Sequence, residues 1–343
     1  MDLQDSLLKI VGYMHRRMDA GTEINCWEWW SGVGFYGVIR AHENTGDAIY
    51  LELLKKWVNK NTANRLHGSV NRVISCCGLD YLDGLEGTNV YDHICKEYED
   101  WALRTAVVAE NGGYGHVWGP NRSGVEMGKP EYAHQLWADS TMMACLFLLR
   151  YGLRKNMEMY YKGVEQLKIH LEALYDEEAG LCYHACDCLH DERLGQFWGR
   201  GNGWVVATIA ELLRLSKDVD IDKEYFGKFF KKIMESAYAR RADNGMLHTV
   251  IDNEESYLEE SGTLLFGYGA IVGVELGILD KKFLKWAEEI AGSLELDECG
   301  GVKYVSDGTG PHSLEHYLTR PYAVKDYGAG LGLMFITEFL NVT

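Results

Sequence analysis

Helical periodicity runs along nearly the whole chain of 343 residues, and only four prolines interrupt it. Apolar positions recur every three or four residues in two alternating kinds of segment. The first kind is rich in glycine and aromatic residues and predicts helices at about 29–45, 69–83, 138–151, 202–216, 260–277 and 326–341. The second kind is charged and amphipathic and predicts helices at about 48–60, 89–107, 157–175, 224–241 and 281–293.

The segment from Asp5 to Asp19 supplies a sixth amphipathic helix at the N-terminus, with its apolar residues on one face. The glycine-rich segments start about 40 to 70 residues apart, which is typical of a helix-hairpin repeat. An open repeat would expose its ends, whereas here the first helix can complete the last pair. The pattern therefore predicts an all-α (α/α)6 barrel, a six-hairpin toroid formed by residues 1–343 as one domain. An open helical repeat that binds proteins is the competing architecture.

The loops before the glycine-rich helices contain most of the residues suited to chemistry. Small residues such as Gly34, Gly37 and Gly330 would let the inner helices crowd around one axis, so these loops should meet in a pocket. The loops and first turns hold Asn25, Trp27, Trp29, Trp30, His67, Asn71, Trp137, Asp139, Trp198, Arg200, Trp204 and Glu259. The connections 109–136 and 176–201 exceed about 15 residues, a length that usually serves a function in a compact domain.

The stretch from Phe197 to Trp204 reads Phe-Trp-Gly-Arg-Gly-Asn-Gly-Trp and opens an apolar helix. Its glycines permit tight turns and close approach of another group. Arg200 offers a fork of donors suited to a carboxylate, and Trp198 and Trp204 offer flat apolar faces that can hold sugar rings. The alternative is an ordinary ion pair for Arg200 and core positions for both tryptophans.

Charge and cysteine content narrow the classes of function. The formal net charge of −17 should repel nucleic acid and anionic membranes, so an anionic substrate would need local Arg and His groups. No apolar run approaches the ~20 residues that span a bilayer. The first residues lack a basic region followed by an apolar run, so we expect no secretory signal. Nine cysteines, an odd number, suggest reduced thiols and a cytoplasmic location.

One cluster of metal-ligand residue types lies within nine positions, namely Cys182, His184, Cys186, Cys188 and His190. Zinc sites usually combine Cys-x2-Cys pairs from two separate places, and this run alternates instead. Alternation is typical of a short extended segment with one face inward. We therefore expect no metal site here.

Asp139 is the carboxylate that the pattern brings closest to the predicted pocket. It precedes an apolar helix, so one role is that of a helix N-cap. The other role is that of a pocket acid beside Trp137, where desolvation would raise its pKa enough for acid catalysis near neutral pH. The two roles are compatible.

Four segments in order resemble glycoside hydrolase family 105, the unsaturated rhamnogalacturonyl hydrolases, and more distantly the family 88 unsaturated glucuronyl hydrolases. They are Gln-Leu-Trp-Ala-Asp (135–139), Gly-Leu-Cys-Tyr-His (180–184), the octapeptide 197–204, and His-Thr-Val-Ile-Asp with Ser-Tyr-Leu-Glu (248–259). Ser-Val-Asn at 69–71 and Gly112 to His116 also resemble family segments. The likeness extends from about Trp27 to Leu340, and the family's (α/α)6 barrel agrees with the helix pattern.

The resemblance implies a glycosidase that releases a 4,5-unsaturated uronic acid from oligosaccharides made by a polysaccharide lyase, without a cofactor or metal. By motif match, Asp139 protonates C4 of the enol ether and assists the addition of water at C5. The resemblance further implies that Arg200 and His184 bind the substrate carboxylate and hydroxyls, and that tryptophans shape the ring pocket. The implied substrate-binding set is Trp29, His116, His134, Trp137, His184, Trp198, Arg200 and Trp204, although His134 matches no family signature and His184 could be a core histidine.

Two departures from the family pattern affect the expectations. Many relatives carry a second aspartate where this chain has Asn71. Asn71 is thus the second candidate catalytic residue beside Asp139, and it can hydrogen-bond substrate or water but cannot ionise. The loop from His116 to Gln135 is longer than usual, so the leaving-group sugar cannot be transferred from the family. Two other classes stay open: a sugar epimerase or isomerase with paired histidines on a similar barrel, and a helical-repeat scaffold with featureless loops.

Overall fold

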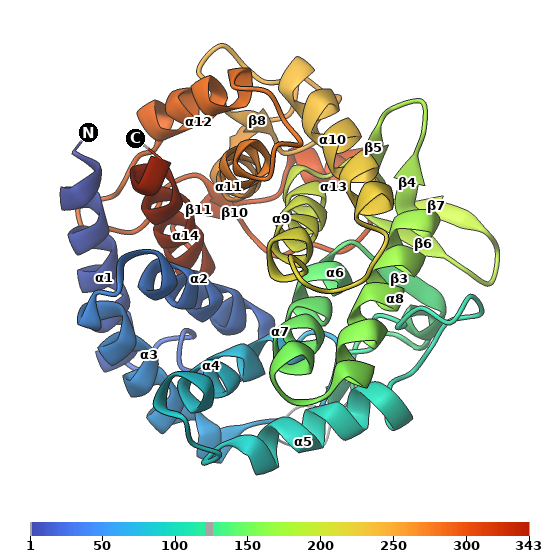
Figure 1. The fold of residues 1–343 in the computed structure, drawn as a ribbon. Coiled ribbons are helices and arrows are strands. Elements are labelled where there is room, and N and C mark those ends of the chain that lie inside the picture. The colour runs from blue at the N-terminus through green and yellow to red at the C-terminus, as the bar shows by residue number, and fades with distance from the viewer. Residues whose placement is uncertain (1, 121–125, 343) are drawn as a thin grey trace.

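Two concentric rings of helices make up the fold (Figure 1). The structure, a computed structural model, describes residues 2–120 and 126–342. In the described part, the inner ring comprises α2 (Trp29–Thr45), α4 (Cys76–Glu86), α6 (Asp139–Met143) continued by α7 (Cys145–Lys155), α9 (Gly199–Leu215), α11 (Glu260–Glu275) and α14 (Asp326–Val342). The outer ring comprises α1 (Leu3–Asp19), α3 (Ala48–Asn61), α5 (Asp92–Asp100), α8 (Met157–Leu174), α10 (Lys223–Ala239) and α12 (Lys282–Ser293). The predicted (α/α)6 barrel is confirmed.

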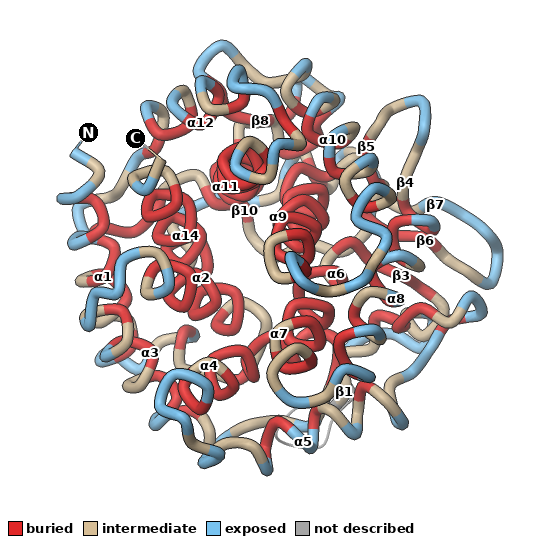
Figure 2. The backbone as a smooth tube through the Cα atoms, in the orientation of Figure 1, coloured by how far each residue is buried: buried red, intermediate tan, exposed pale blue. Residues whose placement is uncertain are grey.

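Burial separates the two rings as the sequence pattern predicts. The inner helices are buried around most of their circumference, whereas the outer helices bury one stripe and expose the other (Figure 2). Short polar side chains start several outer helices, because an N-cap oxygen satisfies a free backbone N–H. Asp2, Asp47, Asn156 and Asp222 each accept a hydrogen bond from the first turn of the helix that follows.

Glycine lets the first and last inner helices touch along their backbones and so closes the ring. A Cβ atom on Gly37 of α2 would lie 1.9 Å from the carbonyl oxygen of Gly330 in α14, and one on Gly330 would lie 2.2 Å from the carbonyl oxygen of Gly34. No other residue type fits such an approach. Helix α1 then packs against α14, where Tyr13 donates a hydrogen bond of 2.8 Å to Asp326. The N-terminal helix thus completes the last pair, as predicted.

Two inner helices differ from their predicted bounds. The second was expected from residue 69, but residues 69–72 form a turn that is followed by a 3₁₀ helix (Val73–Ser75), and α4 begins at Cys76. That turn holds Asn71 and the buried Arg72, whose guanidinium pairs with Glu28 at 3.0 Å. The third inner helix is broken at Ala144 into α6 and α7. The outer helix α5 ends in a π-helical turn (Trp101–Thr105), earlier than predicted.

Short strands connect the loops at one end of the barrel. Strands β3 (Gln135–Trp137), β6 (Ala185–Asp187) and β7 (Glu192–Leu194) form a three-stranded antiparallel sheet in which Trp137 pairs with Ala185. This register brings His184, just before β6, beside the start of α6. The other pairs are β1 (Gly119–Pro120) with β2 (Glu126–Met127), β4 (Tyr175–Asp176) with β5 (Leu181–Cys182), β8 (Leu247–His248) with β9 (Leu258–Glu259), and β10 (Val305–Ser306) with β11 (Tyr322–Ala323). Short helices comprise α13 (Leu314–Leu318) and 3₁₀ turns at Thr62–Asn64 and Pro130–His134.

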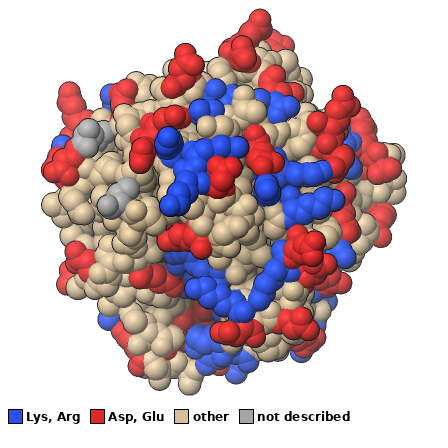
Figure 3. Space-filling view, turned by 45° about the horizontal axis from the view of Figure 1, so that its top comes forward, with Lys and Arg blue, Asp and Glu red and all other residues tan. Residues whose placement is uncertain are grey.

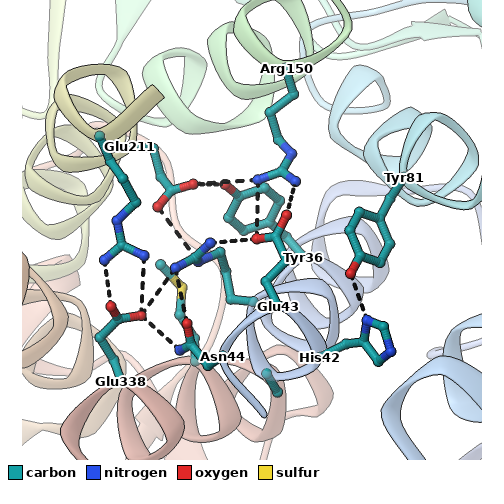
Figure 4. A network of polar contacts seen from close by, with 12 residues as sticks. Tyr36, His42, Glu43, Asn44, Tyr81, Arg150, Glu211 and Glu338 are labelled. Atoms are coloured by element: carbon teal, nitrogen blue, oxygen red, sulfur yellow. Dashed lines mark hydrogen bonds and ion pairs between the residues drawn. The ribbon is translucent and has the colours of Figure 1, made fainter. Parts of the chain in front are cut away.

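A buried network of ionic groups joins the inner helices toward their C-terminal ends (Figure 4). Glu211 of α9 accepts hydrogen bonds from Tyr36 and Tyr268, and its carboxylate lies 3.6 Å from both Arg40 and Arg150. Glu338 of α14 lies 3.2 Å from the same Arg40 and accepts a hydrogen bond of 2.8 Å from Asn44. Removing one member would leave a buried charge uncompensated, so this network ties the helices together at that end.

Surface charge and helix hydropathy complete the outline. Figure 3 shows a face on which basic side chains gather toward the centre and acidic side chains stand along the edge. Among the helices of residues 2–120 and 126–342, none has the length and apolar character needed to cross a bilayer.

Candidate active site

A cavity of about 350 Å³ opens where the N-terminal ends of the inner helices meet. Its wall draws on the starts of several inner helices and on the loop before α14. The lining residues are Glu23, Trp29, Trp30, Asn71, His116, Trp118, Tyr132, Trp137, Asp139, Trp198, Arg200, Asp307, Gly308, Thr309, Gly310, His312, Arg320, Lys325, Asp326 and Tyr327. The predicted convergence of the pre-helix loops on one pocket is thus observed.

Asp139 is the first residue of α6, and its side chain faces the pocket instead of capping the helix. The N-cap position is taken by Ala138, and the helix has no side-chain cap. The Oδ2 atom of Asp139 lies 3.3 Å from Nε2 of His184. This contact is longer and less well aligned than an ordinary hydrogen bond, since neither atom has a partner of good geometry. Hydrogen bonds of catalytic groups often tighten only when substrate binds.

The expected rise in the pKa of Asp139 is wrong for the free protein. Burial would raise this pKa, but the contact with His184 and the nearby positive charge of Arg200 hold it below the ordinary value of 3.8. The residues next to Asp139 in the sequence do not reveal these partners, because His184 lies 45 residues later, just before β6. The resting protein therefore presents a carboxylate to the pocket.

His116 forms a neutral wall on one side of Asp139. Its ring stacks on Trp137 with centroids 3.9 Å apart and an interplanar angle of 5°. Nδ1 lies 3.3 Å from the hydroxyl of Ser140, and Nε2 lies 3.5 Å from the amide nitrogen of Asn71. Burial lowers the pKa of His116 to about 3, so the ring is uncharged near neutral pH. Asn71 thus reaches the pocket wall beside Asp139.

His184 lies behind Asp139 and is fully buried. Its ring stacks on Trp198 at 4.3 Å, and its Nδ1 atom lies 2.6 Å from the hydroxyl of Tyr317 on α13. The motif match had not included Tyr317, which is separated from His184 by 133 residues. A signal was present in the sequence, since the connection from α12 to α14 exceeds about 15 residues and carries His312, His316 and Arg320.

Arg200 lies at the pocket wall, but its guanidinium holds the protein together. Its terminal nitrogens donate hydrogen bonds of 2.6–3.2 Å to oxygen atoms of Ser261, Ser306 and Asp307. Glu259 lies 3.7 Å from the same group, and the indole of Trp198 lies under it at 4.4 Å. The side chain is fully buried. Its expected grip on a substrate carboxylate stays a prediction.

Three residues predicted to bind substrate do not line the cavity, and one of them is His184, which lies behind Asp139. Trp204 is fully buried in the core, because it lies one helical turn into α9 and faces neighbouring helices. His134 is partly exposed, and its Nδ1 atom lies 2.5 Å from the carboxylate of Glu110. Trp29, in contrast, lines the cavity and packs against Tyr327 with centroids 5.0 Å apart.

The cysteine and histidine run does not gather into a metal site. Cys182 belongs to β5, whereas Cys186 belongs to β6, so the run bends between two strands instead of forming one. Across residues 2–120 and 126–342, no three His, Cys, Asp or Glu side chains are placed to hold a metal ion.

Comparison with known proteins relates this geometry to a family. The family model described as Glycosyl Hydrolase Family 88 matches residues 8–343. The unsaturated rhamnogalacturonyl hydrolase YesR of Bacillus subtilis is 31% identical over 92% of this chain and 90% of its own length. The unsaturated 3S-rhamnoglycuronyl hydrolase of Formosa agariphila is 25% identical over 92% of this chain and 85% of its own length.

Solved structures agree on the fold. A crystal structure from Salmonella enterica, described as a possible member of the GH105 family, superposes with a TM-score of 0.90 at 24% identity, covering 99% of this chain and 93% of that one. The unsaturated glucuronyl hydrolase of Bacillus sp. GL1 superposes with a TM-score of 0.70 at 16% identity, covering 97% and 95% of the two chains. At these identities the likeness concerns the barrel.

Proposed function

The chain belongs to Glycosyl Hydrolase Family 88, and on this premise we propose that it releases a 4,5-unsaturated uronic acid from the non-reducing end of oligosaccharides made by a polysaccharide lyase. The names of the relatives in Bacillus subtilis and Formosa agariphila both specify hydrolysis of unsaturated sugars, and each likeness spans 92% of this chain. The substrate is thus a small acidic oligosaccharide.

The observation that carries the proposal is one carboxylate in the described cavity lining that has no lysine or arginine partner. Among the described lining residues, Asp307 pairs with Lys325 at 3.0 Å, and Asp326 pairs with Arg17 at 2.7 Å. Glu23 also lies within 3.9 Å of Arg17. Asp139 has no lysine or arginine partner among them. Ordinary glycosidases need two working carboxylates, whereas an enol ether needs only one group to donate and recover a proton.

Substrate binding would load Asp139 with the proton that the reaction needs. The uronate brings a like charge next to the carboxylate and displaces water, and both effects raise a carboxyl pKa. The lowered pKa of Asp139 describes the free protein, whereas its role as an acid belongs to the complex with substrate. The two are therefore compatible.

The proposed reaction balances on Asp139 and one water molecule. The O–H bond of Asp139 breaks as the π electrons of C4=C5 form a new C4–H bond, which leaves a cation at C5 shared with the ring oxygen. Water adds to C5 and returns a proton to Asp139. The resulting hemiketal opens to a C5 ketone and a C1 hemiacetal, which collapses to an aldehyde and releases the leaving-group sugar.

The cavity wall suits an acidic sugar ring. The indoles of Trp29, Trp137 and Trp198 line the cavity, and Arg200 supplies positive potential close to Asp139. Lys325 and Arg320 add positive groups at the loop before α14. The net charge of −17 repels an anionic substrate, so such a substrate needs positive groups close to the site. These side chains supply them.

Two other classes of function fit the site less well. A sugar epimerase would use histidines that exchange protons near neutral pH, but the pKa of the buried His116 is lowered to about 3. A helical-repeat scaffold would have featureless loops, and it does not require a carboxylate in an aromatic cavity. We further propose a cytoplasmic location, which is supported by nine cysteines that all occur as free thiols.

The test is loss of ultraviolet absorbance from the C4=C5 bond of unsaturated disaccharides. The variant Asp139→Asn should lower kcat by a factor of about 10²–10⁴ while the circular dichroism spectrum stays unchanged. The exposed Asp218→Asn, just beyond the C-terminal end of α9, is the matched control and should retain wild-type turnover. Wild-type turnover by Asp139→Asn would remove Asp139 from the acid role. A wild-type protein inactive on disaccharides derived from pectin, chondroitin, heparin and ulvan would refute the proposed function.

A further inference from the structure

A buried chain of three side chains leads from α13 to the pocket. The hydroxyl of Tyr317 lies 2.6 Å from Nδ1 of His184, and Nε2 of the same ring lies 3.3 Å from Oδ2 of Asp139. Tyr317 and His184 are at most 1% exposed. Water is therefore excluded from both ends of the imidazole, and each ring nitrogen meets the group that the fold places against it.

The surroundings of Tyr317 determine the direction of its hydrogen bond. The phenol has one proton and two acceptors within reach, Nδ1 of His184 at 2.6 Å and the carbonyl oxygen of Gly310 at 3.4 Å. The contact with Nδ1 is much the shorter of the two. The carboxylate of Asp139 lies 3.3 Å from Nε2 on the other side of the ring and would repel a lone pair there, so a neutral imidazole places its hydrogen on Nε2 and its lone pair on Nδ1. Tyr317 therefore donates to Nδ1.

We propose that Tyr317 is a positioning residue that holds His184 in the neutral tautomer with hydrogen on Nε2, directed at Oδ2 of Asp139. A donated hydrogen bond at Nδ1 requires a lone pair on that atom, so the ring hydrogen of a neutral imidazole must lie on Nε2. The role of this contact in turnover rests on the function proposed above, whereas the tautomer itself does not.

This tautomer gives the two carboxylate oxygens of Asp139 different roles. The N–H of His184 faces Oδ2 at 3.3 Å and stabilises the carboxylate that remains after the proton has left. The other oxygen, Oδ1, is left to carry the proton to C4 and to recover one from water. If the hydrogen were on Nδ1 instead, a lone pair at Nε2 would face the carboxylate of Asp139 and repel it. This repulsion would raise the energy of the ionised Asp139 that accepts the proton from water.

The loop before α9 is built to admit this contact. Gly195 has a φ of +79°, and a Cβ atom there would lie 2.6 Å from the hydroxyl oxygen of Tyr317 and 2.9 Å from Cβ of His184. Any side chain at this position would push the phenol away from the imidazole. Trp198 stacks on the ring from one face with centroids 4.3 Å apart and fixes the plane of the imidazole.

The experiment reads the tautomer and the turnover separately. Long-range ¹H–¹⁵N spectra of ¹⁵N-histidine-labelled protein report which ring nitrogen carries hydrogen, and the variant His184→Gln identifies the signal of His184. In the wild type we expect hydrogen on Nε2 alone. In Tyr317→Phe we expect a mixture of tautomers, with kcat reduced about tenfold to a hundredfold and KM within about twofold.

Tyr160→Phe is the matched control. Tyr160 lies on α8, away from the cavity, and is also buried, and its hydroxyl lies 2.5 Å from that of Ser216. It should change neither the spectrum of His184 nor kcat. Hydrogen on Nδ1 in the wild type, or a Tyr317→Phe variant with wild-type tautomer and kcat, would overturn the inference. A changed tautomer in Tyr317→Phe together with an inactive wild type would refute the proposed function and leave the link between Tyr317 and His184 standing.

Discussion

Glu260, at the start of α11, is a buried carboxyl group that we predict to be protonated at neutral pH. Its side chain is fully buried, and neither oxygen has a hydrogen-bond partner among the described residues. The adjacent Glu259 takes the available donors, the N–H groups of Ser261, Gly262 and Ser306, and also lies near Arg200. Burial, with a smaller contribution from Glu259, raises the pKa of Glu260 from 4.5 to about 8.

The raised pKa of Glu260 makes stability fall as the pH rises. The folded state keeps a proton that the unfolded state releases above pH 4.5, so unfolding becomes easier until the folded group also ionises near pH 8. At 1.36 kcal/mol per pKa unit, the free energy of unfolding loses about 3 kcal/mol between pH 5 and pH 8. Glutamine keeps the shape without the ionisation. The variant Glu260→Gln should therefore gain about 3 kcal/mol on the wild type over this range.

Thermal unfolding at pH 5, 6, 7 and 8, followed by tryptophan fluorescence, measures the difference. For a chain of this size, 3 kcal/mol corresponds to about 4 °C in Tm. The Tm of Glu260→Gln relative to wild type should rise by that amount from pH 5 to pH 8. The exposed Glu254→Gln is the control and should show a constant difference. Equal pH dependence in wild type and Glu260→Gln would show that Glu260 ionises normally, and the reasoning from burial would fail.

Two further predictions concern the framework of the barrel. Arg200→Ala should lower the free energy of unfolding by about 3–5 kcal/mol, because it leaves Glu259 buried without its cation, and chemical denaturation at neutral pH measures the loss. A stable variant in which only KM rises would instead assign Arg200 to substrate binding. Gly37→Ala should prevent folding, since its Cβ would lie 1.9 Å from a carbonyl oxygen of α14, whereas Gly292→Ala on the exposed side of α12 should be neutral or stabilising by up to about 1 kcal/mol. Similar stability of both alanine variants would contradict the close packing of α2 and α14.

Much of the fold could be predicted because its determinants are local. Helical periodicity, polar caps and runs of glycine within apolar helices depend on residues a few positions apart, and together they predict two rings of helices. The same locality places Trp137 and Asp139 at a helix start that faces the pocket. The exact starts of the inner helices were less predictable, because the turn at 69–72 serves Arg72 and its distant partner Glu28.

Only the tertiary structure decides the chemical state of these residues. The pKa of Asp139 is lowered because His184, 45 positions later in the sequence, lies beside it. The guanidinium of Arg200 is occupied by Ser261 of α11 and Ser306 of β10, which lie 61 and 106 residues further on. Tyr317 enters the site through a short helix without a recognisable motif. Charge states and hydrogen-bond partners depend on distances of a few ångströms between such remote segments, and the order of residues along a chain does not contain those distances.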